Sequence, residues 1–115
     1  MNMNELITLS IQKLPVIIFI MRNGTLGMVR QWQKLFWGKR YSATSLPDVI
    51  DYEKLAAAFG LNGWRVDSIS GLKQAITAAR ETGKAAVICC DVYIDENVWP
   101  IVPPGDSLEN QRMEE

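Results

Sequence analysis

The sequence predicts an α/β fold in which helices cover both faces of a mostly parallel sheet, giving three α/β/α layers. Two observations predict it. Segments with helical spacing alternate with short apolar runs rich in β-branched residues, and a helix precedes a strand three times along the chain. Each strand–helix–strand crossover should be right-handed. No linker or internal repeat divides the 115 residues, so we predict one partial domain over residues 1–115.

The first half of the chain predicts a helix, a buried strand and a second helix. Apolar side chains recur at helical spacing in residues 4–14 and again in residues 25–37. Between them, residues 15–22 (PVIIFIMR) are typical of a buried strand, and Asn23-Gly24 is a turn signal. The predicted apolar faces are Ile7, Ile11 and Leu14 on the first helix, and Leu26, Val29, Trp32 and Phe36 on the second.

A surface loop over residues 38–49 leads to the third helix. Asp51 is a plausible N-cap of this helix, and Gly60 ends it. Residues 63–67 then predict a short strand. The predicted apolar face of the third helix is Tyr52, Leu55 and Phe59.

The last helix and strand precede a tail. Ser70 could cap a helix that ends at Gly83 and carries Leu72, Ile76 and Ala79 on one face. Residues 85–94 (AAVICCDVYI) predict another buried strand. Residues 96–115 contain three prolines and a glycine, which predicts an irregular Pro-rich tail. Because the chain opens on a helix, a sheet of three strands would keep one edge exposed, and we expect something upstream of it.

Composition and charge exclude several classes of function. A net charge of -1 gives no field for nucleic acid or an anionic membrane, so we expect neither as a partner. The chain has no histidine, which excludes Ser–His and Cys–His catalytic arrangements. Cys89 and Cys90 are adjacent and would point to opposite faces of a strand, so they predict small core residues rather than a disulfide. A reducing, cytoplasmic location is therefore expected.

The turn after the first predicted strand is the candidate site. In open α/β sheets ligands bind beyond the carboxyl ends of the strands, and here residues 23–27 (NGTLG) join that end to a helix. Two glycines permit close backbone approach, and helix N–H groups favour a phosphate. The Asn23 side chain offers a hard oxygen suited to Mg²⁺. From these residues alone, an ordinary Asn-Gly turn between strand and helix is the favoured interpretation, and the anion or metal site is the alternative.

Longer stretches resemble a known family. Residues 21–42 (MRNGTLGMVRQWQKLFWGKRYS) resemble the acetolactate synthase large subunit, which carries an Asn-Asn pair, a Gly-Met-Val segment, Gln-Trp-Gln and an Arg-Tyr-Ser loop. Residues 1–6 are similar to the helix start that follows the family's Gly-Asp-Gly segment. Residues 51–60 resemble its next helix, and residues 96–105 (ENVWPIVPPG) its Pro-rich end. The similarity covers nearly the whole chain.

The resemblance implies a thiamine diphosphate and Mg²⁺ site. Asn23 is similar to the second Asn of the family's pair, a metal ligand, and Thr25 would provide a main-chain carbonyl ligand. Gly24 and Gly27 would lie against the diphosphate, and Met28 near the cofactor.

The same resemblance gives Trp32 a place in the substrate channel. From periodicity alone, Trp32 and Trp37 could both be core aromatics, and for Trp37 we keep that interpretation. Arg22 departs from the family by replacing the first Asn of the pair. The predicted solvated basic face is Arg30, Lys34, Lys39 and Arg40.

The resemblance further implies an incomplete enzyme. The family's Gly-Asp-Gly segment and its catalytic-glutamate domain are not in this sequence, so we name no catalytic residue and expect weak or no cofactor binding by this chain alone. The expected function is a fragment of an acetolactate synthase, a transferase of branched-chain amino-acid biosynthesis, with the remainder of the large subunit as partner and a homodimer possible. The alternatives are a non-catalytic, dimerising α/β module and a piece of a related thiamine-diphosphate decarboxylase or carboligase.

Overall fold

The structure is a computed structural model that describes residues 2–113, and in it the chain divides into two compact units. The sheet unit comprises the residues up to Arg22 together with Asp48–Val92. The helix–tail unit comprises Asn23–Pro47 together with the residues from Tyr93 on. The chain therefore passes between the units three times, and the first passage falls at the start of the candidate loop.

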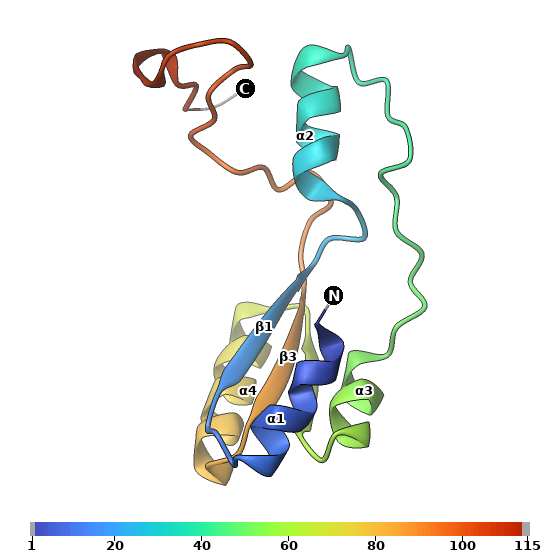
Figure 1. Cartoon of the computed structure of the whole chain (residues 1–115), viewed down its shortest axis with the longest axis vertical. Coiled ribbons are helices and arrows are strands. Elements are labelled where there is room, and N and C mark those ends of the chain that lie inside the picture. Colours follow the sequence, from blue (N-terminus) through green and yellow to red (C-terminus); the bar gives the residue numbers. More distant parts are fainter. Residues whose placement is uncertain (1, 114–115) are drawn as a thin grey trace. The chain divides into compact units, whose positions relative to one another are not determined.

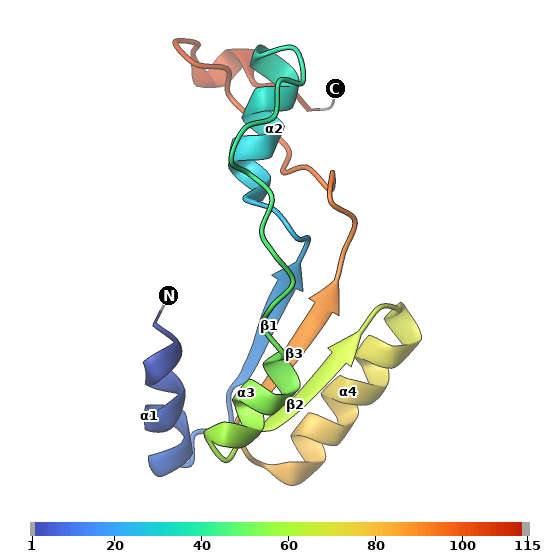
Figure 2. The same ribbon diagram turned by 90° about the vertical axis from the view of Figure 1, so that its right-hand side faces the viewer.

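The sheet unit contains three parallel strands (Figures 1 and 2). These are β1 (Ile17–Arg22), β2 (Asn62–Val66) and β3 (Ala86–Asp91), in the order β1-β3-β2. The register aligns Ile17 of β1 and Asn62 of β2 with Ala86 of the central strand. The predicted parallel sheet is confirmed, and its carboxyl edge brings Arg22 beside Asp91.

Helices cover both faces of the sheet, as Figure 2 shows. On one face, α1 (Leu6–Ile11) and α3 (Tyr52–Ala58) pack through Leu6 and Ala56 against Val87. On the other face, α4 (Ile69–Thr82) packs through Ala75 against Ile88 and Cys90. Because β3 lies in the middle, every residue of Ala86–Cys90 is buried, which explains its continuous apolar sequence.

The observed helix caps agree with the caps predicted from the sequence at all but one position. Asp51 caps α3, as predicted, by accepting a hydrogen bond from the Lys54 N–H at 3.0 Å. The cap predicted at Ser70 was wrong, because the N-cap of α4 is Ser68, two residues earlier. Ser68 has extended backbone and accepts from the Gly71 N–H at 3.3 Å. Gly83 ends α4 with a left-handed φ of 62°.

The predicted apolar face of the first helix was also wrong. Residues Met3–Glu5 form a short 3₁₀ turn before α1, and Leu14 lies beyond the end of the helix. Ile7 and Ile11 are 45% and 67% exposed, whereas Leu6 and Leu9 pack into the core. Two sets of apolar side chains fit the helical period here, and tertiary packing selects the other set.

The helix–tail unit contains α2 (Gly27–Phe36) and a tail with a short 3₁₀ turn at Leu108–Asn110. A bridge pairs Ile101 with Arg112, so the Pro-rich tail folds back on itself. The predicted helix is confirmed, but its predicted apolar face is not buried: Leu26, Val29 and Trp32 are 46%, 48% and 36% exposed.

Candidate functional site

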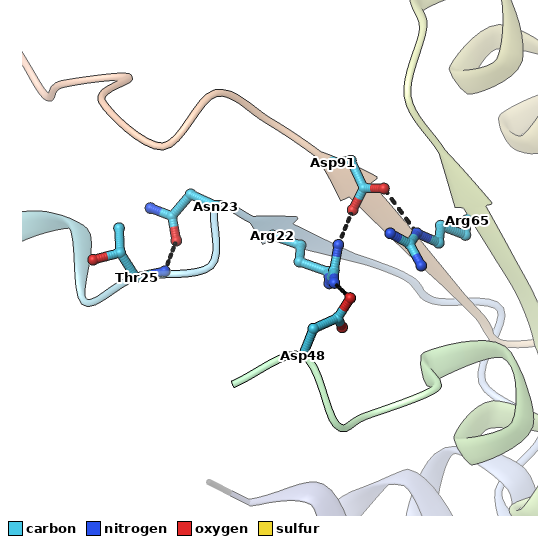
Figure 3. A network of polar contacts seen from close by, with 6 residues as sticks. All are labelled: Arg22, Asn23, Thr25, Asp48, Arg65 and Asp91. Atoms are coloured by element: carbon cyan, nitrogen blue, oxygen red, sulfur yellow. Dashed lines mark hydrogen bonds and ion pairs between the residues drawn. The ribbon is translucent and has the colours of Figure 1, made fainter. Parts of the chain in front are cut away.

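The loop after β1 is a tight turn fixed by its own side chains. The Thr25 N–H donates to Asn23 Oδ1 at 3.1 Å, and Gly24 adopts a left-handed φ of 66° (Figure 3). A Cβ at position 24 would meet nothing within 4 Å, so glycine serves the backbone conformation there. The Asn23 amide oxygen keeps a second lone pair. The turn therefore orients that oxygen while leaving it able to accept a ligand.

Gly27 is required because there is no room for a side chain, and not because of its backbone conformation. A Cβ there would lie 2.8 Å from Asn23 Nδ2, closer than packed atoms tolerate. Gly27 is also the first residue of the ten-residue helix α2, whose first N–H groups have no partner within the helix. The Asn23 side chain thus lies against a helix N-terminus, where backbone dipoles favour an anion.

A returning segment supports the loop. The Leu26 N–H donates to the Thr44 carbonyl at 2.8 Å, and the Leu46 N–H donates to the Gly24 carbonyl at 2.9 Å. The Thr25 hydroxyl, which is buried, also donates to the Thr44 carbonyl at 2.8 Å. The Thr25 hydroxyl therefore helps to fasten the returning segment to the loop.

Met28 and Trp32 line one apolar pocket on α2. The pocket has a volume of about 640 Å³ and is open to solvent. Trp32 stacks edge-on with Phe36 at 5.8 Å between ring centroids. Trp37 lines the same pocket and is 48% exposed, so its predicted core position was wrong. The remaining lining residues are Val29, Gln33, Arg40 and Ser42.

An ionic network crosses the carboxyl edge of the sheet (Figure 3). Arg22 pairs with Asp48 through one guanidinium nitrogen and with Asp91 through the other, at 2.7 Å. Arg65 of β2 binds the second oxygen of Asp91, also at 2.7 Å. Partial burial opposes the ionisation of Asp91, yet the two arginines hold its pKa below the usual range. The hydrogen bonds that Arg22 donates to Asp48 and Asp91 raise the pKa of Arg22 above its ordinary value.

The tail is fastened to α2 by polar contacts that the sequence did not predict. Gln31, only 2% exposed, donates to the Val98 carbonyl at 2.9 Å and accepts from the Val98 N–H at 3.0 Å. Arg30 binds Asp95 at 2.6 Å and stacks on Tyr41 at 3.8 Å from the ring centroid. The solvated face predicted for Arg30 was therefore wrong.

The metal-binding capacity of the described residues is limited. No group of three or more Cys, Asp or Glu side chains in residues 2–113 lies where it could hold a metal ion. Cys89 and Cys90 are free and buried, as predicted, and burial raises the pKa of both thiols. A metal at the loop would thus depend on the neutral oxygens of Asn23 and Thr25 together with ligands from a cofactor or another polypeptide segment.

Comparison with known proteins identifies the fold that presents this loop. Residues 1–90 match the family described as thiamine pyrophosphate enzyme, C-terminal TPP binding domain. The chain belongs to this family. A solved structure, the thiamine diphosphate-dependent 4-hydroxybenzoylformate decarboxylase of Rhodococcus jostii RHA1, is similar with a TM-score of 0.72 at 26% identity, over 83% of this chain and 18% of that one.

Similar curated proteins narrow the relationship. Acetolactate synthase isozyme 2 large subunit of Escherichia coli strain K12 is 40% identical over 107 residues, covering 93% of this chain and 20% of that protein. The probable acetolactate synthase large subunit of Methanocaldococcus jannaschii is 39% identical over 111 residues, covering 96% and 18%. The chain spans about a fifth of the length of these relatives. The predicted resemblance to acetolactate synthase large subunits is confirmed.

None of the helices formed by residues 2–113 is long and apolar enough to span a bilayer.

Proposed function

We propose that this chain is the C-terminal cofactor-binding part of a thiamine-diphosphate-dependent acetolactate synthase, which condenses pyruvate with a second 2-oxo acid. The identity of about 40% with the large subunits of such synthases, over 93% of the chain, is the observation that carries the proposal. The family match supports thiamine diphosphate as the cofactor. Magnesium and the substrates are further parts of the proposal.

The loop after β1 has the atoms that a diphosphate–magnesium group requires. Asn23 Oδ1 is held toward Thr25, and hard amide and carbonyl oxygens suit Mg²⁺. Gly24 and Gly27 leave the turn free of side-chain bulk, and the α2 N-terminus favours the diphosphate. The ligands from this chain carry no charge, so we infer that a carboxylate elsewhere in the complete synthase completes the metal site.

The roles of the chain's own residues are binding and orientation. Bound thiamine diphosphate would supply the carbanion chemistry of the reaction. Asn23 and the Thr25 carbonyl would hold the metal, and Met28 would lie beside the cofactor. Trp32, in the same apolar pocket as Met28, would line the path of the 2-oxo acids.

The remainder of a synthase-length large subunit is the proposed partner. β1 pairs only with β3 among the strands described, so one of its edges is open. Phe19 and Met21, on the face of β1 opposite Ile18 and Ile20, are 46% and 63% exposed. An open parallel edge with exposed apolar side chains is the surface that an added strand and helix would cover. Two free cysteines are compatible with a cytoplasmic location, which we include in the proposal.

The same open edge favours one alternative function. A second copy of the chain could pair with β1, making the protein a dimerising, non-catalytic module. Sedimentation over a range of concentrations distinguishes the two ideas, because the alternative requires a concentration-dependent dimer that leaves cofactor binding absent.

Amide NMR titration of the 115-residue chain tests the cofactor proposal. Millimolar thiamine diphosphate with Mg²⁺ should shift the amides of residues 23–28, because NMR detects weak binding that calorimetry misses. Thiamine without the diphosphate should not shift them. Asn23→Ala should abolish the response, whereas Asn110→Ala, an exposed asparagine of the tail, should preserve it. An unchanged response in Asn23→Ala would contradict the ligand assignment, whereas unshifted loop amides in the parent chain would mean that binding requires the carboxylate supplied elsewhere in the synthase.

A further inference from the structure

Arg22 lies where the chain leaves the sheet, and its contacts reach all three passages between the two units. The first passage follows Arg22 itself, the second precedes Asp48, and the third follows Val92. The Arg22 side chain binds Asp48 and also Asp91, one residue before Val92. The Arg22 carbonyl accepts from the Val92 N–H at 3.1 Å. One residue thus contacts the chain at each point where it leaves or re-enters the sheet unit.

The chain segments that continue from two of these passages form the candidate loop. Leaving Arg22, residues 24–26 pair with residues 44–46, which lead back to Asp48. Three hydrogen bonds hold the pairing: the Leu26 N–H and the Thr25 hydroxyl donate to the Thr44 carbonyl, and the Leu46 N–H donates to the Gly24 carbonyl. The ion pair between Arg22 and Asp48 holds together the two ends of the segment that contains this pairing. The hydrogen bonds between residues 24–26 and 44–46 then form at a lower entropy cost.

We propose that Arg22 is a positioning residue that sets the Asn23–Thr25 loop by tying the strand before it to Asp48 and Asp91. An arginine suits this task because its planar guanidinium presents charged N–H groups to two carboxylates in a fixed geometry, whereas lysine is a point charge without that geometry and asparagine carries no charge. The Arg22 side chain is 19% exposed, that of Asp91 27% and that of Asp48 60%, so solvent competes less for the Asp91 contact than for the Asp48 contact. The proposal concerns loop geometry and holds whatever the loop binds.

The sheet supplies a matched control in Arg65. Arg65 binds the same Asp91 at the same distance of 2.7 Å, but it lies on β2, away from the three passages. Its side chain is 50% exposed. Removing Arg65 therefore removes one partner of Asp91 without disconnecting residues 22 and 48.

Hydrogen exchange of individual amides in the full chain tests the proposal. Arg22→Asn should speed exchange of the Leu26 and Leu46 amides by roughly three- to tenfold, the range expected for losing a charge-assisted contact in a network. The Val87 and Ile88 amides, buried in the central strand, should exchange as in the parent chain. Arg65→Asn should leave the Leu26 and Leu46 amides unchanged. Equal effects of the two arginine variants, or no effect of Arg22→Asn, would overturn the proposal.

Two more variants separate positioning from general stability. Asp48→Asn removes an exposed partner, so the chain should fold, and it should speed the same two amides. The double variant Arg22→Asn/Asp48→Asn should add little to either single change, since coupled residues are non-additive. Arg22→Lys should restore only part of the protection. Additive effects in the double variant would overturn the proposal. Cofactor titration does not enter this test, so the two proposals can fail separately.

Discussion

The helices α4 and α2 are both amphipathic, yet they are held in opposite ways. α4 buries its apolar side against β3, with Ala75 and Ala79 at 4% and 1% exposure. α2 keeps Met28, Val29 and Trp32 exposed, and its one buried residue is the polar Gln31. An apolar stripe therefore shows where a helix could pack, but in the helix–tail unit polar contacts hold the helix and the stripe stays open.

The largest effect on stability is expected from a substitution in the core of the sheet unit. Ile88 is fully buried at the centre of β3, so Ile88→Ala should destabilise the chain by about 2–5 kcal/mol through lost burial and a cavity. Urea unfolding followed by circular dichroism measures the loss. The same substitution at Ile69, which is 70% exposed at the start of α4, is the control and should cost far less. A similar loss for both would mean that burial does not hold this unit.

Gln31→Ala tests the polar attachment of the tail. The substitution removes both hydrogen bonds to the part-buried Val98 backbone, each worth roughly 0.5–1.5 kcal/mol, and should free the tail for proteolysis. Gln33 provides the control, because it makes the same two-bond contact with the backbone of Ser42 in a more exposed setting. Gln33→Ala should cost less. If protease cleaved the tail of both variants equally, the special role of Gln31 would be refuted.

These two helices also show how far the sequence leads. The alternation of helical and strand patterns and the apolar run of β3 were sufficient to predict the parallel sheet, because the helix and strand periods both follow from backbone geometry. The loop after β1 could be singled out because a strand end, two glycines and a helix start adjoin in sequence. Gln31 and Asp95 could not, since their partners lie 67 and 65 residues away and no period links them. The departure at Arg22 was visible, but its two carboxylate partners depended on the fold.

The ion pair between Arg30 and Asp95 should make the helix–tail unit sensitive to acid. The hydrogen bond that Asp95 accepts from Arg30 holds the pKa of Asp95 below the ordinary carboxylate value. The unfolded chain then binds the proton more readily, so the stabilisation is present above the unfolded pKa and is lost as pH falls through the folded one. Tail protection against protease should drop below about pH 4, and Asp95→Asn should show weaker protection at neutral pH with less further loss in acid. An acid response that is the same in Asp95→Asn would assign it to another carboxylate.

The smallest effect on stability is expected at Trp32. Because Trp32 is 36% exposed and lies outside the buried core, Trp32→Leu should change the free energy of unfolding by less than about 1 kcal/mol. A core tryptophan would cost several times more. In a complete synthase the same change should alter recognition of 2-oxo acids while leaving metal affinity unchanged, since the metal ligands proposed are Asn23 and Thr25. A large loss of stability would mean that Trp32 is a packing residue, as the buried residues of α4 are. The exposed apolar face of α2 would then be a packing surface rather than part of a substrate path.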